Sequence, residues 1–176
     1  MTTHRPLLTF LSINALALSL VVALAISCKK TDDPNTPSTT ATIQGNWRLT
    51  AININPPYTD PRAPFPVTEL VGPLNLLEPN CLAGTTLSFN NGTVTNNVAS
   101  VSACTNATLS KQLMSTFFGA STSYTEDGNQ LTIRGPQTVT ATKTISSNTA
   151  TLVTSLSVNP GNQPVPTSYT LVMAKQ

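Results

Sequence analysis

The chain shows its first regular pattern at Ile43, where apolar and polar residues begin to alternate. Every second residue from Ile43 to Ala51 is apolar or glycine, and the positions between them hold Gln, Asn, Arg and Thr. A period of two is typical of a strand that is buried on one face only. We therefore predict a first strand over residues 43–51.

Turn signals predict seven further strands. Asn91-Gly92 and Asp127-Gly128 supply residue types that accept the positive φ of tight hairpins, and each pair separates two strand-like segments. Residues 109–118 instead carry apolar side chains at helical spacing, which predicts one short helix. The predicted strands cover residues 85–89, 93–97, 121–125, 130–133, 138–145, 149–158 and 169–175.

Residues 55–80 interrupt this series with seven prolines. Proline cannot donate a backbone hydrogen bond, so a central strand is excluded here and a long, irregular loop is predicted. Loops of this length in small domains are usually lids or binding surfaces. The apolar residues 67–77 within the loop are expected to pack on the rest of the domain.

The N-terminal segment has the pattern of a targeting signal. Residues 8–26 are almost wholly apolar, and Ala25-Ile26-Ser27-Cys28 follows them. This pattern is similar to a bacterial lipoprotein signal peptide, which implies that Cys28 carries a diacylglycerol and becomes the first residue of the mature chain. Ala25 departs from the usual leucine at its position, and the apolar run is nearly long enough for the alternative, an uncleaved membrane anchor.

The expected organisation is a signal peptide (1–27), the lipidated cysteine with a flexible tether (28–42) and one folded domain (43–176). Residues 29–42 contain no aliphatic residue larger than Ala, so they cannot bury enough surface to order themselves. Their start, KKTDD, resembles the signal that directs some lipoproteins to the cell surface, although a solvated linker has the same composition. We expect an outer-membrane lipoprotein, which would be exposed at the cell surface if KKTDD is such a signal.

The composition supports a location outside the cytoplasm. The chain of 176 residues is 39% hydrophobic and only 9% charged, against about 25% charged in typical domains. Abundant Thr, Ser and Asn suit exposed faces of strands better than they suit solvated helices. A net charge of +2, with no basic cluster beyond Lys29-Lys30, argues against a nucleic-acid partner.

Few residues in the chain could support catalysis. The only histidine is His4, which maturation would remove, so a histidine base and zinc sites with histidine ligands are excluded. No carboxylates are expected to pair, and Glu126-Asp127 is predicted to be a solvated turn. We therefore expect no enzyme, no cofactor and no metal.

Cys81 and Cys104 remain as an even pair once Cys28 is acylated. In an oxidising envelope compartment the simplest interpretation is a disulfide. Two free thiols or a metal site with two sulfur ligands are the alternatives.

Several motifs together resemble the lipocalin-like barrels, and especially small envelope lipoproteins with a lipocalin-like domain. They are the first-strand Gly45-x-Trp47, the strand that follows Cys81 and ends in Phe89 and an Asn-Gly turn, and then Cys104. The resemblance covers residues 43–176 and implies an all-β, eight-stranded antiparallel up-and-down barrel, with Trp47 closing one end. Lipocalins usually stack a cation from the last strand on this Trp, and Lys175 is the one candidate. A β-sandwich is the alternative fold.

The remaining function is binding, and we expect the barrel to accept a small hydrophobic ligand at an open end partly covered by residues 55–80. Tyr124 or Tyr169 would orient the ligand with its hydroxyl. Alternatively the barrel is filled and the chain is a structural or interaction lipoprotein; in either case a monomer is expected. The predicted lining residues are Leu49, Phe89, Tyr124, Ile133, Leu152, Tyr169 and Leu171.

Overall fold

The computed structural model describes residues 41–59, 65–104, 106–156 and 167–176. The predicted signal peptide, Cys28 and nearly all of the predicted tether lie outside these residues. All described residues belong to one of the two units into which the chain divides, Pro34–Gln176, called the barrel unit below.

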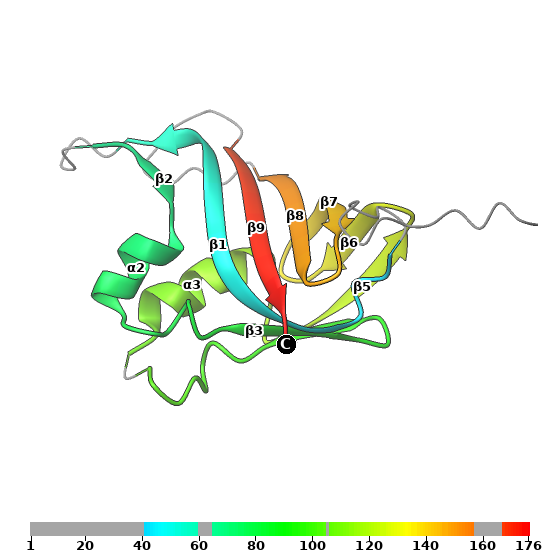
Figure 1. The fold of residues 1–176 in the computed structure, drawn as a ribbon, viewed down its shortest axis with the longest axis horizontal. Coiled ribbons are helices and arrows are strands. Elements are labelled where there is room, and N and C mark those ends of the chain that lie inside the picture. The colour runs from blue at the N-terminus through cyan, green and yellow to red at the C-terminus, as the bar shows by residue number, and fades with distance from the viewer. Residues whose placement is uncertain (1–40, 60–64, 105, 157–166) are drawn as a thin grey trace, which may run out of the picture. The chain divides into compact units, whose positions relative to one another are not determined.

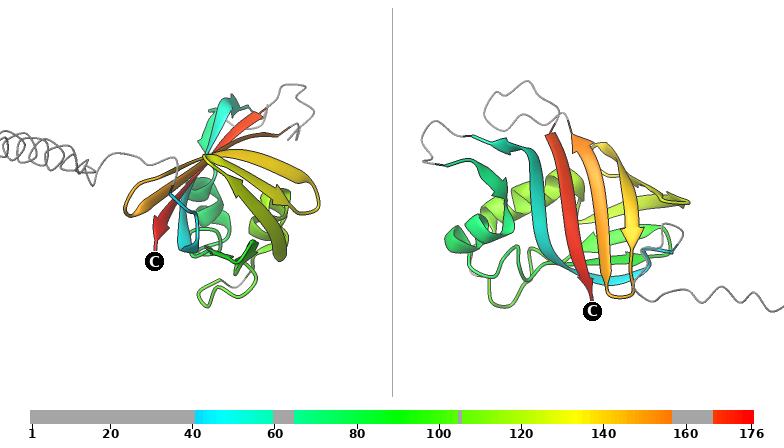
Figure 2. Two further views of the ribbon diagram at one scale, coloured as in Figure 1. Left: turned by 90° about the vertical axis from the view of Figure 1, so that its right-hand side faces the viewer. Right: turned by 45° about the horizontal axis from the view of Figure 1, so that its top comes forward.

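Eight strands form a closed antiparallel up-and-down barrel (Figures 1 and 2). Each strand pairs with the next one along the chain, and the last strand pairs with the first from Trp47↔Lys175 to Asn55↔Ser168. This closure confirms the predicted barrel and excludes the β-sandwich. The barrel strands are β1(Gly45–Tyr58), β3(Thr86–Asn90), β4(Thr93–Asn96), β5(Ser121–Asp127), β6(Gln130–Arg134), β7(Thr138–Ile145), β8(Thr149–Leu156) and β9(Thr167–Lys175).

Residues 55–80 are more regular than predicted. β1 continues through Pro56 and Pro57, and it pairs with the short edge strand β2(Val67–Glu69), so the prediction of a wholly irregular loop is wrong, although the added strand is an edge strand and not a central one. The two prolines lie beyond Asn55, the last β1 residue paired with β9, and their missing N–H groups therefore remove no hydrogen bond from that ladder. The loop also contains the helix α2(Val71–Leu77), so the described residues form two helices where one was predicted.

A carboxylate binds the backbone N–H groups at the start of helix α2. Glu69 accepts hydrogen bonds from the N–H groups of Val71 and Gly72 at 2.6 and 2.7 Å. Pro73 follows in the first turn, where backbone N–H groups have no partner within the helix, so its missing donor costs no helical bond. The glutamate and the proline together start a helix that apolar spacing alone does not reveal.

Helix α3(Thr108–Phe117) lies next to α2, beside β1, and matches the predicted helix to within one residue at each end (Figure 1). The Glu78 carboxylate accepts hydrogen bonds from the N–H groups of Leu109 and Ser110 at 2.7 and 2.8 Å. Burial raises the pKa of Glu78, but the hydrogen bonds from these groups outweigh it and hold the pKa below its usual value. Glu78 thus supplies the negative charge that the first turn of α3 lacks.

A disulfide joins Cys81, which follows α2, to Cys104, which precedes α3. The bond confirms the predicted pairing and excludes the free-thiol and metal alternatives. Cys81 is fully buried, and the two cysteines are 23 positions apart in the sequence. The bridge therefore ties the chain that follows α2 to the chain that leads into α3.

Trp47 lies at the end of the barrel where β1 begins and β9 ends. Its indole N–H donates to the Ile43 carbonyl at 2.7 Å, and the Lys175 ammonium lies 5.8 Å from the ring centre. The cation on the last strand is therefore within the range of a cation–π interaction. Gly45 has a φ of 124°, which residues with a side chain rarely adopt, so glycine is required where β1 enters the barrel.

A buried ion pair anchors the chain that leads into β1. The Lys143 ammonium lies 2.8 Å from the Glu126 carboxylate and also donates to the Ala41 carbonyl. Glu126 in turn accepts from the Ile43 N–H at 2.8 Å and from the Thr42 hydroxyl at 2.9 Å. The prediction that Glu126 is a solvated turn residue is wrong, because β5 still alternates at this position and directs the carboxylate inward.

The barrel unit carries a complete core of its own. The buried hydrophobic cluster runs from Ile43 to Met173 and draws on every barrel strand and on both helices. A closed sheet with its own hydrophobic core and an internal disulfide meets the requirements for independent folding. Within the described residues, neither helix is long and apolar enough to span a bilayer.

Candidate functional site

The interior of the barrel is filled by side chains. All seven predicted lining residues are at most 5% exposed and belong to the core, and six of them lie outside the pocket described below, namely Leu49, Phe89, Tyr124, Ile133, Leu152 and Leu171. Among them, the rings of Phe89 and Tyr124 meet edge to face with centres 5.3 Å apart. The seventh predicted residue, Tyr169, borders a pocket.

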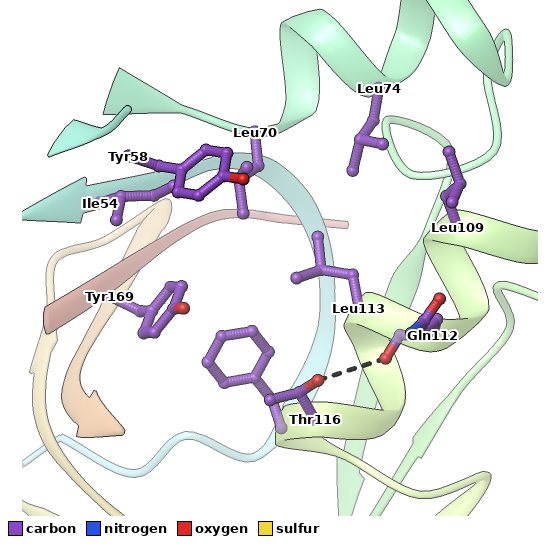
Figure 3. A pocket seen from close by; sticks show the side chains of 10 residues that line it. Ile54, Tyr58, Leu70, Leu74, Leu109, Gln112, Leu113, Thr116 and Tyr169 are labelled. Carbon is purple, nitrogen blue, oxygen red and sulfur yellow. Dashed lines mark hydrogen bonds between the residues drawn. The ribbon is translucent and has the colours of Figure 1, made fainter. Parts of the chain in front are cut away.

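This pocket lies at the end of the barrel opposite Trp47, between the strands and the two helices (Figure 3). Its volume is about 450 Å³, which is within the range of roughly 300–1,000 Å³ typical of small-molecule sites. The pocket is lined by Ile54, Tyr58, Leu70, Leu74, Leu109, Gln112, Leu113, Thr116, Phe117 and Tyr169.

Three parts of the fold position these side chains. Ile54 and Tyr169 are directly paired across β1 and β9. Leu70 and Leu74 are four residues apart at the start of α2, and Leu109, Leu113 and Phe117 repeat that spacing along α3. Residues four apart lie on the same face of a helix, so each helix presents an apolar stripe to the pocket.

The polar groups of the lining are all uncharged. They are the hydroxyls of Tyr58, Thr116 and Tyr169 and the amide of Gln112. The Thr116 hydroxyl already donates a hydrogen bond to the backbone carbonyl of Gln112 at 3.2 Å (Figure 3). The pocket is therefore an apolar cavity with a few hydrogen-bonding groups, the usual character of a ligand site.

Tyr169 is the most deeply placed of the polar lining residues. Its side chain is 4% exposed, and its ring meets Phe117 edge to face with centres 5.1 Å apart. Burial raises the pKa of Tyr169, so the phenol stays protonated and can donate a hydrogen bond at neutral pH.

Two carboxylates lie on residues next to the pocket lining. Glu69 precedes Leu70 and accepts the two N–H bonds at the start of α2, while Glu78 accepts the N–H of Leu109. Both carboxylates are thus hydrogen-bonded to backbone N–H groups in the first turns of the helices. Within the described part of the chain, no group of three His, Cys, Asp or Glu side chains lies close enough to hold a metal ion.

Nine of the ten lining residues are not among those predicted from the sequence. The predicted set came from inward-facing strand positions, whereas seven lining residues lie on the two helices or just before α2. The i, i+4 leucines of residues 70–74 and 109–113 were the available signal. A stripe of this kind is equally typical of a helix that packs on a filled core, so spacing alone does not indicate a pocket.

The chain matches no protein-family model, no curated protein and no solved structure. Its function is therefore argued from the geometry and chemistry of the pocket.

Proposed function

We propose that this protein is a membrane-anchored envelope lipoprotein whose lipocalin-like barrel binds a small apolar molecule without changing it chemically. The observation that carries this proposal is the apolar pocket of about 450 Å³ between the barrel end and the two helices. The ligand would be held mainly by burial of its hydrocarbon surface, which contributes roughly 25 cal/mol per Å².

The architecture around the pocket supports a binding role. The filled barrel end and the two helices, whose connecting chain the disulfide bridges, form the pocket wall on which Leu70, Leu74 and Leu113 present apolar surface. Pre-formed walls lower the ordering cost of binding, because few side chains have to be immobilised when the ligand enters.

The alternative function, a structural or interaction lipoprotein, is favoured by two observations. The barrel interior holds packed side chains, and Leu76 and Leu77 on α2 are 84% and 70% exposed. Exposed leucines beside each other are typical of protein contacts as well as of ligand entrances. The two functions differ in one measurable property, the affinity of the pocket for small apolar molecules.

The pocket is tested by filling it. We expect the barrel unit to bind the neutral fluorophore N-phenylnaphthylamine with a dissociation constant below about 1 mM, and we expect Leu113→Trp to abolish this binding. Leu113 projects into the pocket from α3, and the larger indole would occupy the space that the ligand needs (Figure 3). Fluorescence titration measures the binding, and native mass spectrometry of protein purified without detergent detects a ligand that copurifies.

The matched control is Val153→Trp, which adds an indole at an exposed position of β8 outside the pocket. This variant should bind the fluorophore as the wild type does. If the wild-type unit shows no binding and no copurified ligand, the ligand-binding proposal is wrong and the interaction lipoprotein is the better account.

The membrane anchor is tested separately, on the full chain. We expect Cys28→Ala to release the protein from the membrane fraction, because the variant has no thiol to acylate. Fractionation followed by intact-mass analysis measures the outcome, with Cys28 acylated and residues 1–27 removed in the wild type. Retention of Met1, or unchanged membrane attachment of the variant, would contradict the lipoprotein proposal and favour an uncleaved anchor.

A further inference from the structure

We infer that the pocket selects uncharged molecules that carry a hydrogen-bond acceptor, and that the Tyr169 hydroxyl donates to this acceptor. This inference rests on the proposed ligand-binding function. It narrows the ligand class from any apolar molecule to neutral esters, ketones or alcohols, and it disfavours fatty-acid carboxylates.

The first support is the state of the Tyr169 hydroxyl. The side chain is buried, and Figure 3 shows its hydroxyl directed into the pocket. Among the residues that the structure describes, no side chain or backbone group forms a hydrogen bond with it. The hydroxyl borders the pocket, so an acceptor on the ligand would take up a donor that the described protein groups leave open.

The position of the donor is well defined. Tyr169 stacks edge to face on Phe117 and lies opposite Ile54 in the β1–β9 ladder, so the ring has little freedom to move. The Thr116 hydroxyl, by contrast, already donates a hydrogen bond to the backbone carbonyl of Gln112. Tyr169 is therefore the polar group best placed to orient a ligand whose hydrocarbon contacts the surrounding leucines.

The second support is the charge around the pocket. No described lining residue carries a positive charge that could pair with a carboxylate. Glu69 adjoins Leu70, Glu78 accepts the Leu109 N–H, and the exposed Lys111 adjoins Gln112 without lining the pocket, so the charges beside the lining are of both signs. An anionic ligand would therefore lose its hydration without gaining a cation in the lining, whereas a neutral acceptor avoids this cost.

The test compares three compounds of similar size on the barrel unit. Methyl decanoate carries a neutral acceptor, decanoate carries a charge and undecane has no polar group. Each is titrated against bound N-phenylnaphthylamine at about pH 8, where the free acid is ionised. We expect methyl decanoate to bind at least about tenfold more tightly than decanoate, because burial of an unpaired charge is unfavourable.

The variant Tyr169→Phe removes only the hydroxyl and keeps the ring that contacts Phe117. We expect it to weaken methyl decanoate binding by about fivefold to tenfold, the loss typical of one buried hydrogen bond, and to leave undecane binding unchanged. Tyr124→Phe is the matched control, because its hydroxyl is buried in the core outside the pocket. It should leave the affinity for all three compounds unchanged.

The outcomes separate the inference from the function on which it rests. If decanoate binds the wild type as tightly as its ester, the inference is overturned while the ligand-binding function stands, and this result does not depend on any variant. Equal ester binding by Tyr169→Phe and the wild type also overturns it. If neither the fluorophore nor any of the three compounds binds, the proposed function itself fails.

Discussion

Replacing Glu126 with alanine will lower the free energy of unfolding of the barrel unit by about 3 kcal/mol, near the lower limit for breaking a buried ion pair. The substitution leaves the Lys143 ammonium, which is 1% exposed, with only the Ala41 carbonyl as a hydrogen-bond partner. It also removes the acceptor of the Ile43 N–H. The Glu126 side chain is itself 20% exposed, so water offsets part of the loss. Chemical denaturation measures the change.

The double variant Glu126→Ala/Lys143→Met is the control for this mechanism. It removes the buried charge together with its partner, so it should be more stable than Glu126→Ala alone. A Glu126→Ala protein within about 0.5 kcal/mol of the wild type would show that the pair contributes little, as exposed ion pairs do.

The same pair makes stability depend on pH. Burial raises the pKa of Glu126, but the Lys143 ammonium and the bonds from Ile43 and Thr42 lower it more, so the pKa in the folded state lies below that in the unfolded chain. The stabilisation is therefore complete above the pKa of an unfolded glutamate and is lost as the pH falls through the lower folded value. Acid should destabilise the wild type more than Glu126→Ala.

Replacing both Cys81 and Cys104 with alanine will lower the free energy of unfolding by about 3 kcal/mol, because the bond constrains the unfolded chain over a separation of 23 residues. Alanine is preferred to serine at position 81, since this side chain is fully buried and alanine adds no polar group there. A loss of this size is a large share of the stability of a small domain.

Reduction of the wild-type disulfide provides the matched measurement. The reduced wild type and the double alanine variant should have similar midpoint concentrations of denaturant. Both midpoints should lie well below that of the oxidised wild type. Equal midpoints for the oxidised wild type and the variant would contradict a stabilising role of the bond. We also expect weaker ligand binding without the bond, because it holds the segment between α2 and α3, the two helices that line the pocket.

Local patterns in the sequence predicted most of the barrel. Alternation from Ile43 and the Asn91-Gly92 and Asp127-Gly128 turns are short-range signals, since each depends on the φ/ψ preferences of neighbouring residues. Extending the alternation of β5 by two residues would have predicted that Glu126 faces inward, because Thr122 and Tyr124 are the preceding inward positions.

The candidate site was harder to predict, because its walls are distant in the chain. Ile54 and Tyr169 become neighbours only when β1 pairs with β9. Helix α2 was missed because its start depends on the Glu69 carboxylate, and because Pro73 signals irregular chain when it is read alone.

The sequence by itself determined the strand order, the hairpin turns and the even cysteine pair, because these depend on local conformation and on residue counts. Tertiary structure alone decided where space remains unfilled. Inward-facing side chains of eight strands fill the barrel, and the pocket forms where two helices meet its end without filling the gap. The volume left between packed surfaces depends on the summed shapes of side chains from distant segments, and no periodic pattern in a chain encodes that sum.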